Sequence, residues 1–487
     1  MHDKCNFVGN FAFFDSPFRP RKSIVFEIPC RFASMKSKLK PSQQRSLLFP
    51  TLAEQCDPRQ PLKKLADAIA WDKFEDAFSD YYSEVGRPAK PIRLMVGLLL
   101  LKQLENLSDE VVVERWIQNP YYQYFCGMTE FEWDLPCNPS DLVHFRNRIG
   151  EEGVHMIFAI TTDLHRDRID KESEIIVDTT VQEKNITFPT DTKLHSRIIG
   201  RCWRLADKYG IKLRRRYRKE LRQCLLSQRW RRHPGKAKLA RKAQKRIKTI
   251  AGILLRELDR KLPSQILKAH LEDFKLYLRV LNQQKNDKNK VYSLHEPQAY
   301  CIAKGKENKK YEYGSKASVA VTADTGIIVS VVAHPKNIYD GHTLPEVLEL
   351  AEAVMGERPK KAIVDRGYRG EKHIDGTDIL SPENGKADQS KSEKAKMRKR
   401  FRKRSGIEAI ISHLKHDFRL LRCFLKGSLG DTMNLLLAAC AWNLKKWMGA
   451  VSFRQIYVIW NQVEALVSSL RRLFPDLTSH NLFIALR

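Results

Sequence analysis

Two aspartates lie in segments whose composition is typical of buried β-strands. Residues 174–181 and 361–365 are short apolar runs, and they carry Asp178 and Asp365. Burying an unpaired carboxylate costs several kcal/mol, so such acids are tolerated where a cation pairs with them. Hard divalent metal ions prefer oxygen ligands, and two such ions can hold the attacking and leaving oxygens of a phosphodiester. The alternative is that each aspartate only ends a strand and faces solvent, but two of them in a β-β-β-α-β order favour a metal site.

A third acid, Glu408, lies four residues after Arg404 and seven residues before Lys415. On one continuous helix these three residues share a face, so Glu408 could bind a metal ion while the two cations bind DNA phosphates. A second interpretation is open. Ser405 and Glu408 have the spacing of a capping box, in which Glu408 would only cap the start of a helix. In that case Arg404 lies outside the helix, and the spacing alone does not decide between the two.

The net charge of the chain predicts a polyanionic partner. Among 487 residues, 87 are Lys or Arg and 57 are Asp or Glu, which leaves a net charge of +30. Self-repulsion of this size opposes compaction unless a polyanion relieves it, and every phosphate neutralised by Lys or Arg releases counterions. Nucleic acid is the partner that this charge favours, with a ribosomal or otherwise merely basic protein as the alternative. The length predicts two or three domains.

The cysteines and apolar runs exclude several classes of protein. Ten cysteines are scattered without a CxxC pair, and no histidine pair has zinc-finger spacing, so a structural zinc site is not expected. Such scatter suits reduced thiols in a cytosol. The longest apolar runs, 94–101 and 435–442, are too short to span a bilayer, and residues 1–20 lack the features of a signal peptide. We therefore expect a cytoplasmic protein with no membrane partner.

The first half of the chain is predicted to be mostly helical. Ser108 has the position of a helix cap, Pro120 is expected to stop that helix, and residues 139–150 are expected to form another. These helices could form a DNA-binding unit of the helix-turn-helix kind, and a plain helical bundle explains them equally well. Residues 1–34 are aromatic-rich and lack periodicity, which suggests the hypothesis that translation starts at Met35.

The elements around the two aspartates are expected to alternate strands with helices. The predicted elements are strands at 317–323 and 327–333, a hairpin turn at 324–326, a helix capped by Thr343 with Glu346, a loop at 381–404, and helices at 406–449 and 454–474. Three further acids have structural explanations. Asp340 and Asp324 suit turns, and Asp191, after the first strand, suits a structural role.

A basic segment follows the first strand. It contains the run Arg214, Arg215 and Arg216 and the lysine-rich residues 236–248, with apolar positions that suggest long antiparallel helices. Its charge density favours contact with the DNA backbone, and a solvated helical arm is the alternative.

Five parts of the chain are predicted: an extension at 1–60 that is partly disordered, an N-terminal helical DNA-binding domain at 61–170, a catalytic α/β domain at 171–192 and 296–450, a basic helical insert at 193–295, and a C-terminal helix and tail at 451–487.

Three motifs taken together resemble the DDE transposases of bacterial insertion sequences, in the IS-four and IS-five groups. The chain has a strand acid at Asp178, then Asp365-Arg366-Gly367-Tyr368, then Arg404-x3-Glu408-x6-Lys415. The family signature has a tyrosine where this chain has Phe401, which puts in doubt any role for a phenolic hydroxyl there. The resemblance covers about residues 60–450.

The resemblance implies an RNase H-like mixed sheet flanked by helices. It also implies that Asp178, Asp365 and Glu408 bind two Mg²⁺ ions, for which Mn²⁺ substitutes, and that Arg404 and Lys415 contact DNA phosphates. The expected reaction is cleavage at the inverted repeats of an insertion sequence, followed by attack of the freed 3′-hydroxyl on target DNA. The expected state is a homodimer on DNA, in the nucleoid of a bacterial cytoplasm. The alternatives are a nuclease of the same fold without strand transfer, and a catalytically silent DNA-binding protein derived from a transposase.

Overall fold

The computed structural model describes residues 50–82, 89–284, 286–303, 310–368, 370, 372–382 and 390–473. The hypothesis of a start at Met35, and most of the predicted extension at 1–60, lie outside these residues. No helix among the described residues is long and apolar enough to cross a membrane.

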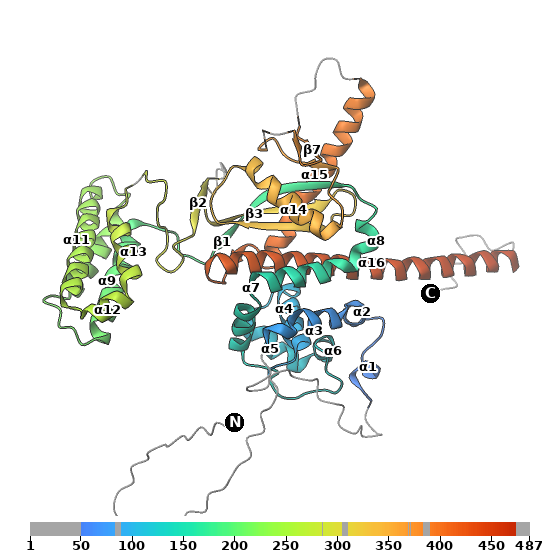
Figure 1. Ribbon diagram of the computed structural model, residues 1–487, viewed down its shortest axis with the longest axis horizontal. Helices are drawn as coiled ribbons and strands as arrows, with labels where there is room; N and C mark the ends of the chain where they lie inside the picture. The colour runs from blue at the N-terminus through green and yellow to red at the C-terminus, as the bar shows by residue number, and fades with distance from the viewer. Residues whose placement is uncertain are drawn as a thin grey trace, which may run out of the picture.

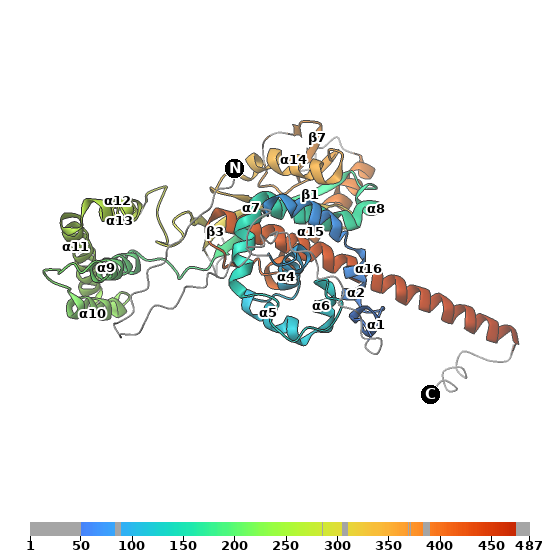
Figure 2. The same ribbon diagram turned by 60° about the horizontal axis from the view of Figure 1, so that its bottom comes forward.

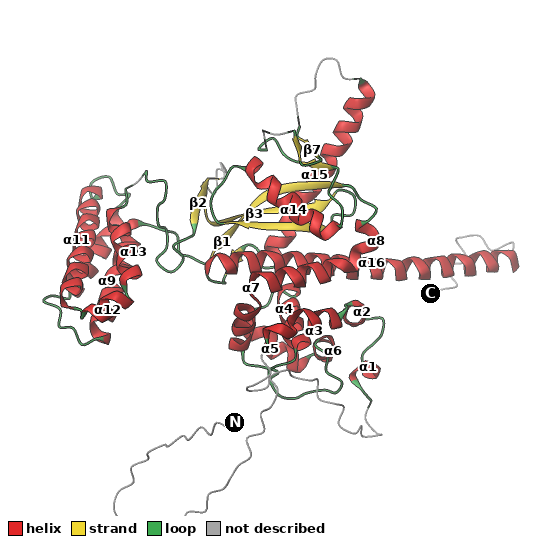
Figure 3. Cartoon of the chain, viewed as in Figure 1, coloured by secondary structure: helices red, strands yellow, loops and turns green. Residues whose placement is uncertain are grey.

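The centre of the molecule is a mixed sheet whose strands run in the order β2-β3-β1-β5-β7-β6, with β4 paired to β3 and β8 paired to β1. The strands are β1 (Glu174–Lys184), β2 (Tyr300–Ala303), β3 (Tyr311–Thr322), β4 (Ile328–His334), β5 (Lys361–Ile363), β6 (His373–Ile374), β7 (Thr377–Leu380) and β8 (Arg422–Cys423). In Figure 3 the strands are confined to this central part of the chain. The α/β class with a mixed sheet and flanking helices is confirmed.

The two faces of the sheet are covered by different helices, because the strand side chains alternate between faces. Ile175 and Val177 of β1 pack in a core with α14 (Leu344–Met355). Ile176 belongs instead to the core that contains apolar residues of α15 (Lys391–His416) and α16 (Gly427–Leu473). This alternation decides on which face each acid of β1 lies.

The N-terminal helices pack directly onto this second core. They are α1 (Leu52–Gln55), α2 (Pro61–Ala68), α3 (Trp71–Phe78), α4 (Ile92–Leu104), α5 (Asp109–Gln118), α6 (Pro120–Phe125) and α7 (Pro139–Thr162). One continuous apolar cluster joins them to α16, and Figure 1 shows α16 running between these helices and the sheet. The Gln103 amide also donates to the Phe418 carbonyl at 2.7 Å. The N-terminal helices and the sheet are therefore one packed body.

The end signals of these helices were mostly predicted correctly. The Ser108 hydroxyl accepts from the Val111 amide at the start of α5, as expected. Pro120 does more than stop that helix, because it also begins α6. The helix predicted for 139–150 continues to Thr162 across a kink at Gly150, whose φ is 64°.

The basic segment forms a separate helical unit after β1. Its helices are α9 (Asp191–Lys208), α10 (Arg218–Ser227), α11 (Ala237–Lys261), α12 (Ser264–Ala269) and α13 (Leu271–Asn282). They bury an apolar cluster of their own that shares no residue with the cores of the sheet. In Figures 1 and 2 this unit stands apart from the rest of the molecule.

Three expectations for the second half of the chain were wrong. Residues 391–404 are not a loop, because α15 begins at Lys391. The helices predicted at 406–449 and 454–474 are divided elsewhere: α15 ends at His416, and α16 runs without interruption through residue 450. Thr343 does not cap α14 with its side chain, because a 3-10 turn (η4, Asp340–Thr343) precedes the helix and the Thr343 hydroxyl donates to the Asp340 carbonyl.

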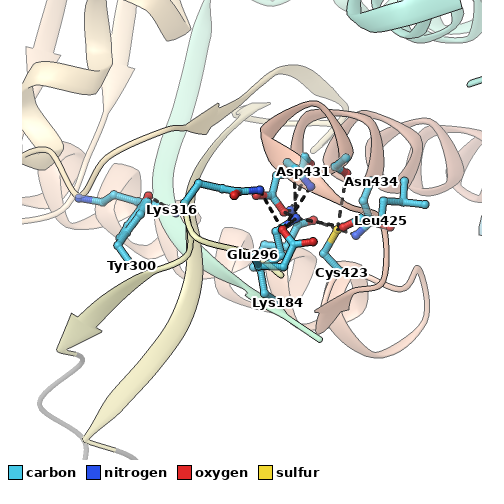
Figure 4. A network of polar contacts seen from close by, with 12 residues as sticks. Lys184, Glu296, Tyr300, Lys316, Cys423, Leu425, Asp431 and Asn434 are labelled. Carbon is cyan, nitrogen blue, oxygen red and sulfur yellow. Dashed lines mark hydrogen bonds and ion pairs between the residues drawn. The ribbon is translucent and has the colours of Figure 1, made fainter. Parts of the chain in front are cut away.

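A buried charge cluster joins the two ends of the insert to α16 (Figure 4). Lys184, at the end of β1, lies 2.9 Å from Asp431 of α16 and 3.3 Å from Glu296, which follows the insert. The lysine side chain is 1% exposed, and its ammonium also donates to the Leu425 and Gly427 carbonyls. Burial raises the pKa of Asp431 although Lys184 opposes the shift. The cluster therefore fixes both ends of the insert against the first turns of α16.

A second charge cluster lies among the N-terminal helices. Asp109 of α5 pairs with Lys102 of α4 and Arg146 of α7, each at 2.7 Å. Burial by itself would raise the pKa of Asp109, but the Arg146 hydrogen bonds and the two positive charges outweigh burial and lower this pKa to about 2. Burial, with Arg146 nearby, lowers the pKa of Lys102 to about 8. The carboxylate of Asp109 thus holds together three helices that meet at two buried cations.

This lowered pKa predicts an acid-sensitive contribution to stability. A carboxyl whose pKa is lower in the folded state stabilises the fold above its unfolded pKa, and this contribution is lost as pH falls through the folded pKa. For Asp109, with a pKa of 3.8 moved to about 2, the contribution is about 2 kcal/mol. Urea unfolding at pH 5 and at pH 2 should show the wild type losing about 2 kcal/mol more than Asp109→Asn. Asp170→Asn, at an exposed ion pair, should lose as much as the wild type; equal losses in all three would refute the role of Asp109.

Candidate active site

Asp178 lies in the middle of β1, on the face of the sheet covered by α15. It is two residues after Ile176, whose side chain packs with Ile407 and Ile410 of α15, and residues two apart on a strand share a face. The expected strand over 174–181 is present, and the alternative that Asp178 only ends a strand is wrong, because β1 continues to Lys184. The Thr179 amide donates to Asp178 Oδ1 at 2.8 Å, which fixes one carboxylate oxygen.

Asp365 is brought beside Asp178 by the register of two parallel strands. Ile176 of β1 pairs with Ile363 of β5, so each aspartate follows its paired isoleucine by two residues. β5 ends at Ile363, and the chain turns immediately after Asp365. The Gly367 amide donates to Asp365 Oδ1 at 2.7 Å. A Cβ atom at Gly367 would lie 2.8 Å from the same oxygen, so a side chain at residue 367 would push the Asp365 carboxylate out of this position.

Glu408 is supplied by the continuous helix α15. Ser405 is an interior residue of this helix, and its hydroxyl donates to the Arg402 carbonyl, so the capping-box interpretation is wrong. Arg404, Glu408 and Lys415 therefore belong to one helix with the spacing of a common face. Phe401, at the position of the signature tyrosine, packs against the apolar core through its ring.

The Arg404 guanidinium lies among the three acids. Its Nη2 atom is 3.6 Å from Asp178 Oδ2 and 3.8 Å from Asp365 Oδ2, and its Nη1 atom is 4.0 Å from Glu408 Oε1. Its Nε atom is a buried donor with no hydrogen-bond acceptor among the described residues. One cation from α15 thus neutralises carboxylates that come from two strands and from its own helix.

The three acids are not yet equivalent in this arrangement. Glu408 is 68% exposed, whereas Asp178 is 15% exposed. In the part of the chain that the structure describes, no three His, Cys, Asp or Glu side chains converge closely enough to hold one metal ion together. The donors are nonetheless all carboxylate oxygens around a positive charge, which is the donor set that a hard divalent cation prefers. Glu408 lies at the exposed edge of the group.

Tyr368 is a buried residue next to this site. It is 2% exposed, and burial raises the pKa of its phenol well above the usual range, with the negative charges of Asp178, Asp340 and Asp365 acting in the same direction. The phenol therefore stays neutral.

Asp340 is a site residue that sequence reasoning missed. It was assigned to a turn, and it does lie in the 3-10 turn before α14. Its carboxylate also accepts from the Thr179 hydroxyl at 3.1 Å and pairs with Lys316 of β3. The only sequence signal was its position before a helix, which a plain turn residue shares.

The three arginines predicted to bind DNA lie in the insert, between α9 and α10. Two of them are already paired: Arg215 with Glu220 at 3.2 Å, and Arg216 with Asp207. Arg214 is exposed, and its backbone amide donates to Glu257. The structure therefore does not bring these arginines into the site of the three acids, and it leaves their charge partly neutralised.

A different set of cations in the insert is free of such pairing. They lie on α11 at positions that share one helical face, and all are exposed: Lys238, Arg241, Lys242, Lys245 and Lys248. Within the described ranges none of them makes an ion pair, in contrast to Arg215 and Arg216. This stripe is a positive surface of the insert that the described acids leave unpaired.

Both halves of the chain match families of known proteins. A family model described as "Transposase domain (DUF772)" matches residues 50–148, and one described as "Transposase DDE domain" matches residues 284–444, which include Asp365 and Glu408. The chain is 42% identical over 165 residues to "Uncharacterized protein ORF8 in nfe locus" of Rhizobium meliloti, which covers 33% of this chain and 80% of that protein. No solved structure matches the chain.

Proposed function

Because this chain belongs to the DDE transposases of insertion sequences, we propose that it cleaves DNA at the ends of such an element and joins the freed 3′-hydroxyl to target DNA. In this proposal Asp178, Asp365 and Glu408 hold two divalent ions, Mg²⁺ or Mn²⁺. The observation that supports it is the meeting of all three acids at the Arg404 guanidinium. When bound, such ions activate the attacking oxygen and stabilise the charge that develops on the phosphate.

The protein's own residues have distinct parts in this reaction. Asp178 and Asp365 are fixed by the Thr179 and Gly367 amides, so their oxygens are oriented before any ligand arrives. Arg404 is always charged and its planar guanidinium matches two phosphate oxygens, so it suits exchange of the carboxylates for the DNA backbone. Lys415, about three turns beyond Arg404 along α15, suits a neighbouring phosphate.

The reaction is tested with DNA that carries the native ends of the element. The duplex is taken from the sequence that flanks the gene, labelled at its 5′ ends, and incubated with the full chain, Mg²⁺ and a supercoiled target plasmid. We expect nicked element ends, and a second labelled product that migrates more slowly on a gel because those ends are joined to the plasmid. Cleaved ends without any joined product would support a nuclease of the same fold and would refute strand transfer.

The partner and location follow from this substrate. The two ends of an element have to be processed together, so we propose a homodimer on DNA that holds one end in each protomer. A chain that acts on chromosomal DNA is proposed to work in the bacterial cytoplasm, at the nucleoid. Light scattering of the chain with and without end DNA tests the dimer, and a complex with the mass of a single protomer on a single end would contradict it.

The stripe of cations on α11 predicts a strong dependence of DNA binding on salt. Each phosphate contact that is lost lowers the slope of log K against log salt by about 0.9. Replacing Lys238, Arg241, Lys242 and Lys245 together by glutamine should therefore reduce the slope by up to about 3 to 4. The triple change of Arg214, Arg215 and Arg216 should have a smaller effect, because two of these charges are already paired.

Fluorescence anisotropy between low and moderate salt measures both slopes on the same labelled duplex. Lys360→Gln removes one exposed lysine outside the insert and serves as the matched control. An unchanged slope in the α11 variant would show that the insert is only a solvated arm.

A further inference from the structure

A fourth carboxylate lies beside the three proposed metal ligands. Asp340 belongs to the turn that precedes α14, on a part of the chain remote in sequence from β1, β5 and α15. Its Oδ1 atom accepts from the Thr179 hydroxyl at 3.1 Å, and its closest contact with Lys316 is through the same oxygen. Thr179 is the residue next to Asp178. The side chain is thus tied to the strand that carries the first acid.

The second oxygen of Asp340 faces the other strand acid. A Cβ atom built on Gly367 would lie 3.3 Å from Asp340 Oδ2 and 2.8 Å from Asp365 Oδ1, so both oxygens border the same small space above the glycine. The absence of a side chain at residue 367 is what lets the two carboxylates approach each other. Like charges at such a separation repel unless a cation lies between or beside them.

Tyr368 gives an independent indication that a ligand binds between Asp340 and Asp365. Its hydroxyl is buried near Asp178, Asp340 and Asp365 and makes no hydrogen bond of good geometry with a described residue. The Thr179 hydroxyl lies close to it, but that hydroxyl donates its proton to Asp340. Buried polar groups are nearly always hydrogen-bonded, so an unpaired hydroxyl beside several carboxylates points to a bound group that the protein alone does not supply.

The surroundings hold Asp340 in place. Lys316 is itself fixed, because its ammonium also donates to the Ile338 carbonyl at 2.7 Å and its side chain is only 10% exposed. Lys316 and Thr179 both contact Oδ1 of Asp340. These two contacts fix the orientation of the carboxylate, and therefore the direction in which Oδ2 points. An acid held in this way keeps its orientation without reorganisation of the loop.

We propose that Asp340 is a fourth oxygen ligand of the metal centre, with Lys316 as the residue that orients it and balances its charge. This inference rests on the proposed function, since it adds a ligand to the centre formed by Asp178, Asp365 and Glu408. The alternative is that Asp340 and Lys316 form an ion pair that only stabilises the fold.

Mn²⁺ binding to the full chain without DNA separates these two roles. Free Mn²⁺ is measured by electron paramagnetic resonance for the wild type and for Asp340→Asn, with Asp375→Asn as the control, because Asp375 is an exposed acid that also pairs with a cation. We expect Asp340→Asn to weaken at least one Mn²⁺ site by about tenfold or more, as loss of a metal ligand or of its support commonly does. Asp375→Asn should bind Mn²⁺ as the wild type does.

Asp340→Asn leaves Lys316 without its partner, and this variant could fold poorly for that reason. The same change is therefore also made in a variant that lacks the lysine. Lys316→Met removes the cation, and the double variant Lys316→Met with Asp340→Asn removes both charges, so neither leaves a lone buried lysine. We expect the double variant to bind Mn²⁺ about tenfold or more weakly than Lys316→Met alone. Equal affinities in this comparison would overturn the proposal and establish the structural ion pair.

Asp365→Asn distinguishes failure of this inference from failure of the proposed function. If Asp365→Asn weakens Mn²⁺ binding while Asp340→Asn does not, the metal centre stands and the fourth ligand is refuted. If neither change weakens binding, the proposed metal centre itself is refuted, and the fourth ligand with it.

Discussion

Replacing Asp365 by asparagine is expected to lower the rate of Mg²⁺-dependent DNA cleavage at least about 1,000-fold, because a metal ion stabilises the transition state by several kcal/mol and about 4 kcal/mol corresponds to that factor. Asparagine keeps the size of the side chain and one oxygen, so the turn after β5 is retained. The Gly367 amide can still donate to the remaining oxygen, as it does to Asp365 Oδ1 at 2.7 Å. The loss therefore reports charge and ligand chemistry.

Single-turnover cleavage of end DNA measures this effect. Asp178→Asn and Glu408→Gln should show losses of the same order, and the exposed Asp375→Asn should leave the rate unchanged. DNA affinity should stay at or rise above that of the wild type, because the acids repel phosphate and contribute nothing favourable to binding the backbone. Cleavage that survives all three changes would refute the assignment of the site.

Replacing Lys184 by methionine is expected to lower the free energy of unfolding by about 3–5 kcal/mol, the cost of leaving buried charges without their partner. The cluster has one cation and two acids, Glu296 and Asp431, and both acids are almost fully buried. Removing the lysine leaves two like charges next to each other in the core. For domains of this size the change corresponds to a fall in melting temperature of about 6–20 °C.

Asp431→Asn is expected to have a much smaller effect on the same measurement. It leaves one lysine with one glutamate, and burial already raises the pKa of Asp431, which shows that its charge is costly where it lies. The asparagine can keep contacts with the Gln182 amide, which donates to Asp431 Oδ1 at 3.1 Å. Lys360→Met, at an exposed lysine, controls for the loss of positive charge. Equal destabilisation by Lys184→Met and Asp431→Asn would contradict the charge balance assigned to the cluster.

The two strand acids could be recognised from sequence because the strands around them are short and apolar. The alternation of Ile175, Ile176 and Val177 already places Asp178 on the face of Ile176. What the sequence could not supply was the parallel pairing of Ile176 with Ile363, because the two segments are separated by the whole insert. Register between distant strands depends on tertiary packing, and that register is what puts the two aspartates side by side.

The first half of α15 could not be predicted from the periodicity of apolar residues. Residues 391–404 are nearly all polar or charged, so no apolar stripe indicated a helix, and a loop was expected. Lysine, arginine, glutamate, alanine and methionine are nevertheless strong helix formers, and the first turns of α15 need no buried face. Intrinsic propensity therefore carries the helix from Lys391 to Phe401, where packing against the core begins. The same extension rules out Ser405 as a cap and puts Arg404 on the helix with Glu408.

Asp340 and Lys316 show the limit of motif reading at the site. Neither residue has a sequence signal that distinguishes it from a turn acid and a strand lysine. Their role appears only when β3 and the turn before α14 meet next to Thr179. The basic insert is an intermediate case: its helical, cationic character could be predicted, but which cations stay unpaired depended on the acids that happen to lie near Arg215 and Arg216.

The most direct test of the carboxylate centre is a change of metal preference. Sulfur ligands favour softer metal ions over Mg²⁺, so Asp365→Cys should lose cleavage in Mg²⁺ and recover it by about tenfold or more in Mn²⁺ or Cd²⁺. The wild type, assayed in the same ions, corrects for their general effect on cleavage. Recovery specific to the cysteine variant would place residue 365 in contact with the metal. Full cleavage by Asp365→Cys in Mg²⁺, or the same response to all three ions as the wild type, would contradict a metal centre at these carboxylates.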